Sequence, residues 1–506
     1  MRRIEGRGDH VVVVGAGLAG LATAMHLAGR GRSVTVLERD AGPGGRTGRL
    51  DHGGYRLDTG PTVLTMPGIM RDTFAAVGAD LDDHLRLRPL DPAYTACFAD
   101  GSGLAVHADG DRMADAVRAF AGPREADGYR RLRAWLTRLH DVEFGRFVAA
   151  NVDSPFGLLS GDLARLVALG GFRRLTPKIA SFLHDERLQR VFSFQALYAG
   201  ESPMRALALY AVISYMDTVG GVVFPEGGVA ELPRAMAAAA AGAGVTFRYG
   251  EPVVSLERRG TRITAVHTGH GQRVPCDAVV LATELAVSYR LLGRTPKRPV
   301  RLRAAPSAVV LHAGLPSAAA DLGHHTISFG GAWATTFDEL IKTGRLMSDP
   351  SLLITRPTAT DASLAPPGKE LYSVLAPVPN LERGPRDWAG LAESYADELA
   401  AVVRERLLPD FVPEMRRVLS PADWAAQGMV AGTPFSYAHS FPQTGPFRPR
   451  NLPRGVSNVV LAGGGTVPGV GVPTVLLSGR LAADRVTGPE PGPRRTAIDL
   501  AAKGTP

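Results

Sequence analysis

Apolar positions near the N-terminus change their period twice within a short stretch. Residues 11–14 are four consecutive valines, and such an unbroken β-branched run predicts a strand buried on both faces. Apolar side chains then recur three and four positions apart from Leu18 to Met25, which predicts a helix over residues 18–30. Residues 33–37, SVTVL, predict a second strand. Strand, glycine turn, helix and strand in this order predict a βαβ unit, rather than a signal peptide or a membrane-spanning helix.

The turn inside this unit has the glycine spacing of a dinucleotide site. Gly15 permits a tight turn, Gly17 lets the backbone approach a pyrophosphate, and Gly20 lets helix and strand pack closely. The helix that follows directs free N–H groups and the positive end of its dipole toward the phosphates. Glu38 ends the second strand, where an acid accepts a hydrogen bond from the adenosine ribose. The predicted nucleotide-binding residues of this unit are Gly15, Gly17, Leu18, Ala19, Gly20, Glu38 and Arg39.

The next residues favour FAD over NAD as the nucleotide. An NAD domain continues into further βαβ units, whereas this chain bends back through glycines and arginine in DAGPGGRTGR and then GGYRLDTGPTVL. The pattern resembles a flavoprotein group in which Gly-Gly-Arg follows the ribose-binding acid. That resemblance implies that Arg46 lies near the FAD phosphates or the flavin edge. The residues expected at FAD from this segment are Gly45, Arg46, Gly60, Pro61 and Thr62.

The other half of the expected flavin site lies near the C-terminus. Residues 459–462 predict a short strand, residues 463–466 a loop of backbone donors, and Pro473 the first turn of a helix that runs to about residue 485. Such a helix start directs N–H groups at the flavin N1–C2=O edge and stabilises the charge of reduced flavin. In similar flavoproteins a middle segment, predicted here as four strands, contacts the adenine and the pyrophosphate. The residues expected from these two segments are Val253, Ala282, Thr283, Gly464, Gly465, Thr466 and Val470.

With these pieces in order, the chain resembles the bacterial and fungal type of phytoene desaturase, an FAD-dependent carotenoid dehydrogenase, over nearly all of residues 9–487. The motifs that carry the resemblance are LDTGPTVLT, VFPEGGVAEL, HHTISFGG, TDASLAPPGKELYSVLAPVPNL and AGGGTVPGVGVP. Two departures fall in the last motif. The family often has His where Val467 stands, and related flavin reductases have Asp near the ribityl chain where Thr466 stands.

The resemblance implies desaturation of a C40 carotenoid precursor, phytoene to lycopene or intermediates, by hydride transfer to flavin N5 and proton loss. Oxygen or a membrane quinone is the expected electron acceptor. Arg146 and Glu226 are the first candidates for catalytic residues because similar enzymes have charged residues in these regions, and Asp141 and Asp217 come next. The alternatives are a carotenoid isomerase, ketolase or later-step desaturase of the same family. An amine oxidase-like flavoprotein is a further alternative, and it needs a lysine near N5 and an aromatic cage.

The expected fold class is α/β. A Rossmann-type FAD-binding domain with two dinucleotide-binding segments is assembled from residues 9–110, 221–290 and 452–487, and an α+β substrate domain spans residues 291–451. A mostly helical region at 111–220 forms a membrane-facing lid. Residues 488–506 are rich in Pro and Gly and predict a disordered tail.

The net charge and the cysteine content limit the possible partners of the protein. The formal net charge of +8 permits nucleic acid or an anionic membrane as a partner, but the arginines are scattered and no nucleic-acid motif is present. Residues 155–185 alternate apolar stretches with arginines and a lysine, which predicts interfacial amphipathic helices or, equally, ordinary lid helices packed on the core. Two cysteines and no metal-ligand spacing suit a cytoplasmic protein without a metal site. The expectation is a peripherally membrane-associated enzyme that binds a carotenoid hydrocarbon and no nucleic acid.

Overall fold

The four valines form the central strand of a parallel sheet. The computed structural model describes residues 1–296, 301–316 and 322–489. In it, β1 (His10–Val14) pairs with β2 (Ser33–Leu37) on one side and with β14 (Ala278–Leu281) on the other, and Val11, Val12 and Val13 are fully buried. The strands come from three separate parts of the chain, in the order β10 (Thr246–Arg248), β2 (Ser33–Leu37), β1 (His10–Val14), β14 (Ala278–Leu281) and β20 (Val459–Leu461).

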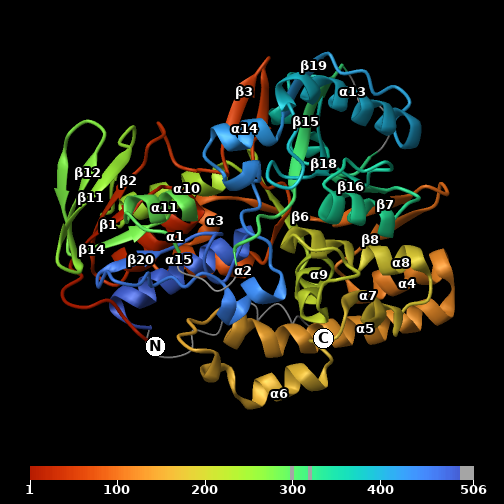
Figure 1. Ribbon diagram of the computed structural model, residues 1–506. Coiled ribbons are helices and arrows are strands. Elements are labelled where there is room, and N and C mark those ends of the chain that lie inside the picture. The colour runs from red at the N-terminus through yellow and green to blue at the C-terminus, as the bar shows by residue number, and fades with distance from the viewer. Residues whose placement is uncertain (297–300, 317–321, 490–506) are drawn as a thin grey trace.

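Two different layers cover the faces of this sheet (Figure 1). Val11 and Val13 pack into a core shared with the helices, whereas Val12 and Val14 pack into a second core shared with β12 and β13. This burial on both sides explains the unbroken valine run. The helical layer consists of α1 (Leu18–Ala28), α10 (Glu231–Gly242) and α15 (Val472–Thr487). The opposite layer is an antiparallel sheet of β11 (Val253–Arg259), β12 (Arg262–Thr268) and β13 (Arg273–Pro275).

A second large sheet has seven strands and carries helix α13 (Trp388–Arg406) on one face. Val309, Leu311, Trp388 and Val403 belong to the core between them. The strand order is β19 (Met415–Leu419), β15 (Ser307–Leu315), β18 (Glu370–Val378), β17 (Leu352–Thr355), β16 (His325–Phe329), β7 (Tyr94–Phe98) and β8 (Gly103–Val106). Residues 9–110 were expected to belong to the FAD-binding domain alone. Because β7 pairs with β16, this segment contributes strands to the seven-stranded sheet as well as to the parallel sheet.

A helical region lies beside the second sheet, in the lower part of Figure 1. It consists of α4 (Gly110–Ala121), α5 (Pro123–Glu143), α6 (Gly161–Ala168), α7 (Leu175–Ala180), α8 (Glu186–Val191) and α9 (Ala211–Thr218). The Asp109 carboxylate caps α4 by accepting hydrogen bonds from the N–H groups of Asp111 and Arg112. The remaining elements are β3 (Arg49–His52), β4 (Tyr55–Asp58), β5 (Leu64–Thr65), β6 (Leu87–Leu90), β9 (Val222–Pro225), α2 (Pro67–Ala75), α3 (Leu81–His84), α11 (Leu285–Leu291), α12 (Ala334–Phe337) and α14 (Pro421–Ala426).

The expected α/β fold class is confirmed, and the element boundaries differ from prediction in small ways. The first helix ends at Ala28, and the C-terminal helix spans Val472–Thr487. Residues 245–284 hold five strands where four were expected, since the three-residue β10 pairs with β2 at the edge of the sheet. Among the described residues, no helix is long and apolar enough to cross a membrane. Most of the expected tail, residues 490–506, lies outside the described residues.

Candidate functional site

The glycine turn after β1 has the close contacts that its spacing predicts. Gly15 has a φ of +105°, a conformation that side chains disfavour, and a Cβ on Gly20 would overlap the carbonyl oxygen of Gly15. At Gly17 the space is open, because an added Cβ would meet no atom nearer than the Gly44 oxygen at 3.9 Å. The turn therefore leaves room beside the N-terminus of α1, where N–H groups and the helix dipole attract a phosphate. This cradle fits the pyrophosphate of FAD.

Glu38 is buried at the end of β2, beside the same turn. Its carboxylate accepts hydrogen bonds from the N–H groups of Ala16 at 2.6 Å and Asp40 at 3.0 Å, which fix its position. The neighbouring Arg39 is exposed and donates to the Gln427 oxygen at 3.0 Å. The Glu38 carboxylate is thus fixed beside the glycine turn, whereas the Arg39 side chain is directed toward another loop.

The second glycine segment folds back onto the first. Gly44 donates to the Ala16 oxygen at 3.0 Å, and a Cβ on Gly45 would lie 3.3 Å from Gly17 Cα. The Arg46 guanidinium forms an ion pair with Glu284, and a Cβ on Gly60 would overlap the Arg46 oxygen. The residues that the flavoprotein resemblance grouped together are therefore adjacent in space.

The middle segment reaches the turn through β14. The Ala282 N–H donates to the Val14 oxygen at 2.9 Å, and a Cβ on Gly15 would lie 3.0 Å from the Ala282 oxygen. The Thr283 hydroxyl is hydrogen-bonded to the Ser288 hydroxyl at 2.8 Å. Val253 begins β11 in the covering sheet.

The C-terminal loop 463–466 is held from behind by a buried cation. Arg448 is 1% exposed, and its guanidinium donates to the carbonyl oxygens of Thr466 at 2.9 Å and Gly464 at 2.5 Å. The Thr466 hydroxyl donates to the Pro449 oxygen at 2.7 Å. Because a trans peptide points its C=O and the following N–H in opposite directions, the N–H groups of residues 465 and 467 point away from Arg448. Arg448 therefore orients two donors of this loop, which sequence patterns gave no reason to expect.

A cavity of about 680 Å³ begins at these segments and continues into the rest of the molecule. Predicted cofactor residues in its wall are Leu18, Arg46, Gly60, Pro61, Thr62, Gly464 and Val470. Most of the remaining wall is apolar and comes from the seven-stranded sheet and the helical region. These residues include Val148, Phe194, Ile213, Ile327, Phe329, Leu340 and Leu353.

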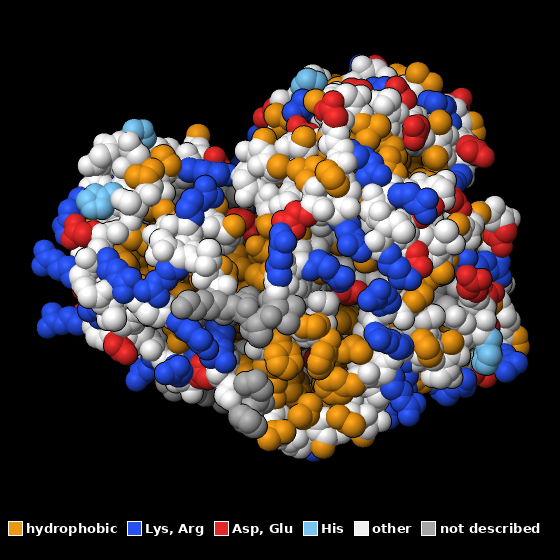
Figure 2. All heavy atoms as spheres, viewed as in Figure 1, with side chains coloured by type: hydrophobic (Ala, Val, Ile, Leu, Met, Phe, Trp, Pro, Cys, Tyr) orange, Lys and Arg blue, Asp and Glu red, His pale blue; other side chains and the backbone are white. Residues whose placement is uncertain are grey.

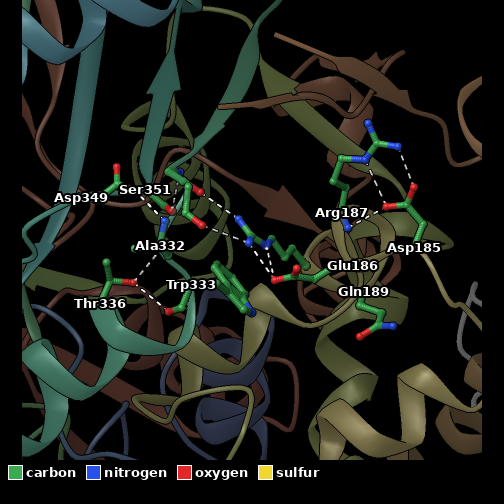
Figure 3. A network of polar contacts seen from close by, with 12 residues as sticks. Asp185, Glu186, Arg187, Gln189, Ala332, Trp333, Thr336, Asp349 and Ser351 are labelled. Carbon is green, nitrogen blue, oxygen red and sulfur yellow. Dashed lines mark hydrogen bonds and ion pairs between the residues drawn. The ribbon is translucent and has the colours of Figure 1, made fainter. Parts of the chain in front are cut away.

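A polar network fixes one aromatic residue of this wall, Trp333 (Figure 3). Asp349 accepts a hydrogen bond from Ala332 N at 2.7 Å, and the Thr336 hydroxyl donates to the Trp333 oxygen at 2.9 Å. The Arg190 guanidinium lies 5.5 Å from the Trp333 ring centroid and donates to the Gly330 oxygen at 2.8 Å. The network ties α8 to the sheet and holds the indole against the cavity.

The two predicted catalytic residues lie outside the cavity wall. Arg146 is an exposed residue of the π-helical turn Phe144–Val148 that follows α5, and Glu226 forms an ion pair with Arg88 at the surface. Three other acids line the cavity instead. Burial raises the pKa of Glu143 and Asp217 to about 8, and that of Asp58, which accepts hydrogen bonds from two backbone N–H groups, to about 6. Asp217 was a lower-ranked candidate.

Glu143 was missed, although the pattern of α5 contains a signal for it. It continues the buried stripe of Leu132, Leu136 and Leu139 at helical spacing. An acid at an apolar position of an amphipathic helix indicates a buried ionisable group.

Comparison with known proteins agrees with this site. A model of the flavin-containing amine oxidoreductase family matches residues 18–487. A phytoene dehydrogenase of Streptomyces griseus is 63% identical over 493 residues, which are 97% of each chain. The chain belongs to the phytoene desaturases of this flavin-dependent family. A zeta-carotene-forming phytoene desaturase of Myxococcus xanthus is 35% identical over 492 residues, covering 95% of this chain and 94% of its own.

The fold of this phytoene desaturase family member is also that of a solved oxidoreductase from Methanosarcina mazei. The two share 17% sequence identity with a TM-score of 0.61, over 93% of this chain and 98% of the other. Membership of the family makes the chain an FAD-dependent oxidoreductase, and the glycine cradle, Glu38 and the Arg448 loop are the features that fit FAD.

Proposed function

We propose that this chain desaturates phytoene to lycopene, or to an intermediate between them, in carotenoid biosynthesis. The observation that carries the proposal is one continuous cavity that joins the expected flavin-binding segments to a mostly apolar wall. A C40 hydrocarbon offers no charge and no hydrogen-bonding group. Its recognition therefore depends on cavity shape and on apolar burial, at about 25 cal/mol per Å².

When bound, FAD supplies the acceptor for a hydride. The turn at Gly15–Gly20 would hold its pyrophosphate and Glu38 its ribose, while the N–H groups that Arg448 orients would meet the flavin end. The apolar wall keeps water from the reacting carbons and positions them. The chain thus contributes orientation and electrostatics, and the cofactor contributes the redox chemistry.

The test is expression of this chain in carotenoid-free cells that make phytoene, followed by pigment analysis. We expect lycopene or an intermediate, and a yellow purified protein. A Gly17→Val variant is the control, because its side chain would occupy the open space of the cradle, so flavin and pigment should both be lost. Unchanged phytoene beside a flavin-loaded wild-type protein would reject the proposal.

The same cells distinguish the other activities. A carotenoid isomerase, ketolase or later-step desaturase would leave phytoene unchanged and act only on a more unsaturated carotenoid. The amine oxidase alternative is disfavoured, because no lysine among the described residues lines the cavity. Oxygen or a quinone is the acceptor we propose, and anaerobic assays with and without an added quinone test that choice.

We further propose that the enzyme docks on a membrane surface, on the cytoplasmic side, at the point where the cavity meets the exterior. Five large apolar side chains between 41% and 69% exposed support this: Leu159, Val167, Phe172, Phe441 and Phe447. Phe172, Phe441 and Phe447 also line the cavity, and the Phe441 and Phe447 rings lie 5.7 Å apart. Figure 2 shows hydrophobic side chains gathered on the face where α6 lies, with Lys and Arg side chains beside them.

A hydrocarbon substrate resides in the bilayer, so an opening at the lipid surface would admit it directly. Interfacial surfaces gain from buried apolar area and from basic residues near anionic lipid, and Arg165, Arg173 and Arg174 are exposed next to these side chains. Replacing Phe172, Phe441 and Phe447 by serine should release the flavin-loaded protein from anionic liposomes. The matched control replaces Val254 and Val412, which are exposed elsewhere at 58% and 67%, and should leave sedimentation unchanged. Equal sedimentation of the triple variant and wild type would place the contact elsewhere.

A further inference from the structure

The carboxyl group of Glu143 is buried at the end of α5. Glu143 is the last residue of this helix and is 6% exposed, and within the described part of the chain its Oε2 has no hydrogen-bond partner. The helix changes here into the π-helical turn Phe144–Val148, a local distortion that is frequent at functional sites. The side chain lines the cavity, whose hydrocarbon ligand would need no polar contact from it.

Two contacts tie the residues just after Glu143 to α15, the helix that follows the C-terminal loop. Arg480 donates to the Ala149 oxygen at 2.8 Å, and the Asn151 side chain donates to the Leu481 oxygen at 2.9 Å. The Tyr210 hydroxyl donates to the His439 oxygen, and the His439 ring lies so close to Gly469 that a Cβ there would overlap it. Glu143, Tyr210, His439 and Val470 all line the same cavity, so the carboxyl shares its wall with the loop at which the chemistry of a bound flavin would occur.

We propose that the Glu143 carboxylate accepts the proton that the substrate releases during desaturation. This inference rests on the proposed function. Two neighbouring C–H bonds of the hydrocarbon break: one hydrogen leaves with both electrons as a hydride to the oxidised flavin, and the other leaves as a proton to Glu143. The electron pair of the second C–H bond forms the new C=C bond. The proton then passes from Glu143 to solvent, and oxygen or a quinone removes the two electrons from the reduced flavin.

The surroundings of Glu143 favour this role. Burial alone raises its pKa to about 8, so its ionised form is a stronger base than an exposed carboxylate. The ionisable groups beside it come from its own helix and turn, from two packed helices and from the same cavity wall. They are His140, Asp141 and Arg146, then Asp162 and Arg165 on α6, Tyr215 and Asp217 on α9, and Tyr210 and His439 in the wall. Burial lowers the pKa of His140 and His439 and raises the pKa of Tyr210 and Tyr215, so these four are neutral near pH 8. Arg480 donates to the Ala149 oxygen at 2.8 Å, and Arg165 pairs with Asp162.

The first test measures the pH dependence of single-turnover flavin reduction by phytoene, in wild type and in Glu143→Gln. The wild-type rate should rise with pH to a plateau above about 8, since the carboxylate is the active form. The amide variant should lose roughly 100-fold in rate and the pH dependence as well. Asp127→Asn is the control, because Asp127 is an exposed acid on the same helix and its variant should keep both.

A second readout needs no turnover. Infrared titration of the holoenzyme should show a protonated carboxyl band that disappears between pH 7 and pH 9. The band should be present in the Asp217→Asn variant and reduced in the Glu143→Gln variant. Glu143→Asp, which keeps a titrating group, should retain the pH profile at a lower rate even if the amide variant folds poorly. A flavin-loaded Glu143→Gln enzyme with the wild-type rate and profile would overturn the proposal, and so would an Asp variant without the profile. Absence of any phytoene turnover by wild type would instead refute the proposed function.

Discussion

Two buried acids should make this protein lose stability as the pH rises from 6 to 8. In the fold, Glu143 and Asp217 have pKa values of about 8, against ordinary values of 4.5 and 3.8. Below about pH 3 both are protonated in either state. Above that, only the unfolded chain ionises readily, so stability falls with rising pH until the folded pKa is passed. At about 1.4 kcal/mol per pH unit, each acid costs about 2 kcal/mol between pH 6 and pH 8.

The measurement compares wild type with the double variant Glu143→Gln, Asp217→Asn, whose amides cannot ionise. Buried histidines with lowered pKa values, such as His312 and His325, change stability in the opposite direction over the same range, but both proteins contain them. Urea unfolding of the flavin-loaded proteins at pH 6, 7 and 8 should therefore show their stabilities diverging by about 4 kcal/mol, to the disadvantage of wild type. Asp127→Asn controls for removal of an exposed acid. Parallel pH curves for wild type and the double variant would refute the reasoning.

Two further predictions concern the cofactor. Gly20→Ala should abolish flavin binding or folding, because its Cβ would overlap the Gly15 oxygen. The control Gly31→Ala should have a much milder effect, because an added Cβ there meets no atom, although its φ is +73°. The flavin absorbance of the two purified proteins measures the difference. Arg448→Met should weaken FAD binding about 10- to 100-fold, because it removes charged hydrogen bonds worth about 1.5–3 kcal/mol. Flavin fluorescence during dilution measures this affinity. The control replaces an exposed cation, and the Arg234→Met protein should bind FAD normally. Normal FAD affinity of the Arg448 variant would mean that the loop holds its shape without the cation.

Local patterns predicted the flavin-binding half of the fold well. The valine strand, the glycine turn and the helix from Leu18 depend on neighbours within a few residues, and the structure places them as expected. The pairing of β7 with β16 could not be predicted, because it joins residues more than two hundred positions apart and leaves no mark on either segment. In the same way, Arg448 looks like any arginine in a proline-rich loop until the fold buries it.

The expected membrane region shows a second limit of the pattern. Within residues 155–185, Leu166 is 4% exposed whereas Val167 is 58% exposed, and an apolar side chain looks the same in sequence whether it faces the core or the exterior. The flanking arginines do not distinguish a lid helix packed on the core from a helix that lies in the membrane interface, because they are exposed in both arrangements. Glu143 and Glu226 show the same limit: a charged residue looks the same in sequence whether it is buried at a cavity, as Glu143 is, or pairs at the surface, as Glu226 does with Arg88.

The discontinuous parallel sheet has a consequence for how the protein is made. Strand β1 ends at Val14, but its neighbour β14 and the outer β20 lie at residues 278–281 and 459–461. At translation rates of roughly 5–20 residues per second, the last strand leaves the ribosome tens of seconds after the first. During that interval the valine strand has an unpaired edge and exposed apolar faces, which is a hazard for aggregation. Flavin can therefore be captured only after synthesis is nearly complete, because the C-terminal part of its site is made last. The yield of flavin-loaded protein should then depend on protection of the unfinished chain. Added chaperones or slower growth should raise this yield more than added riboflavin does.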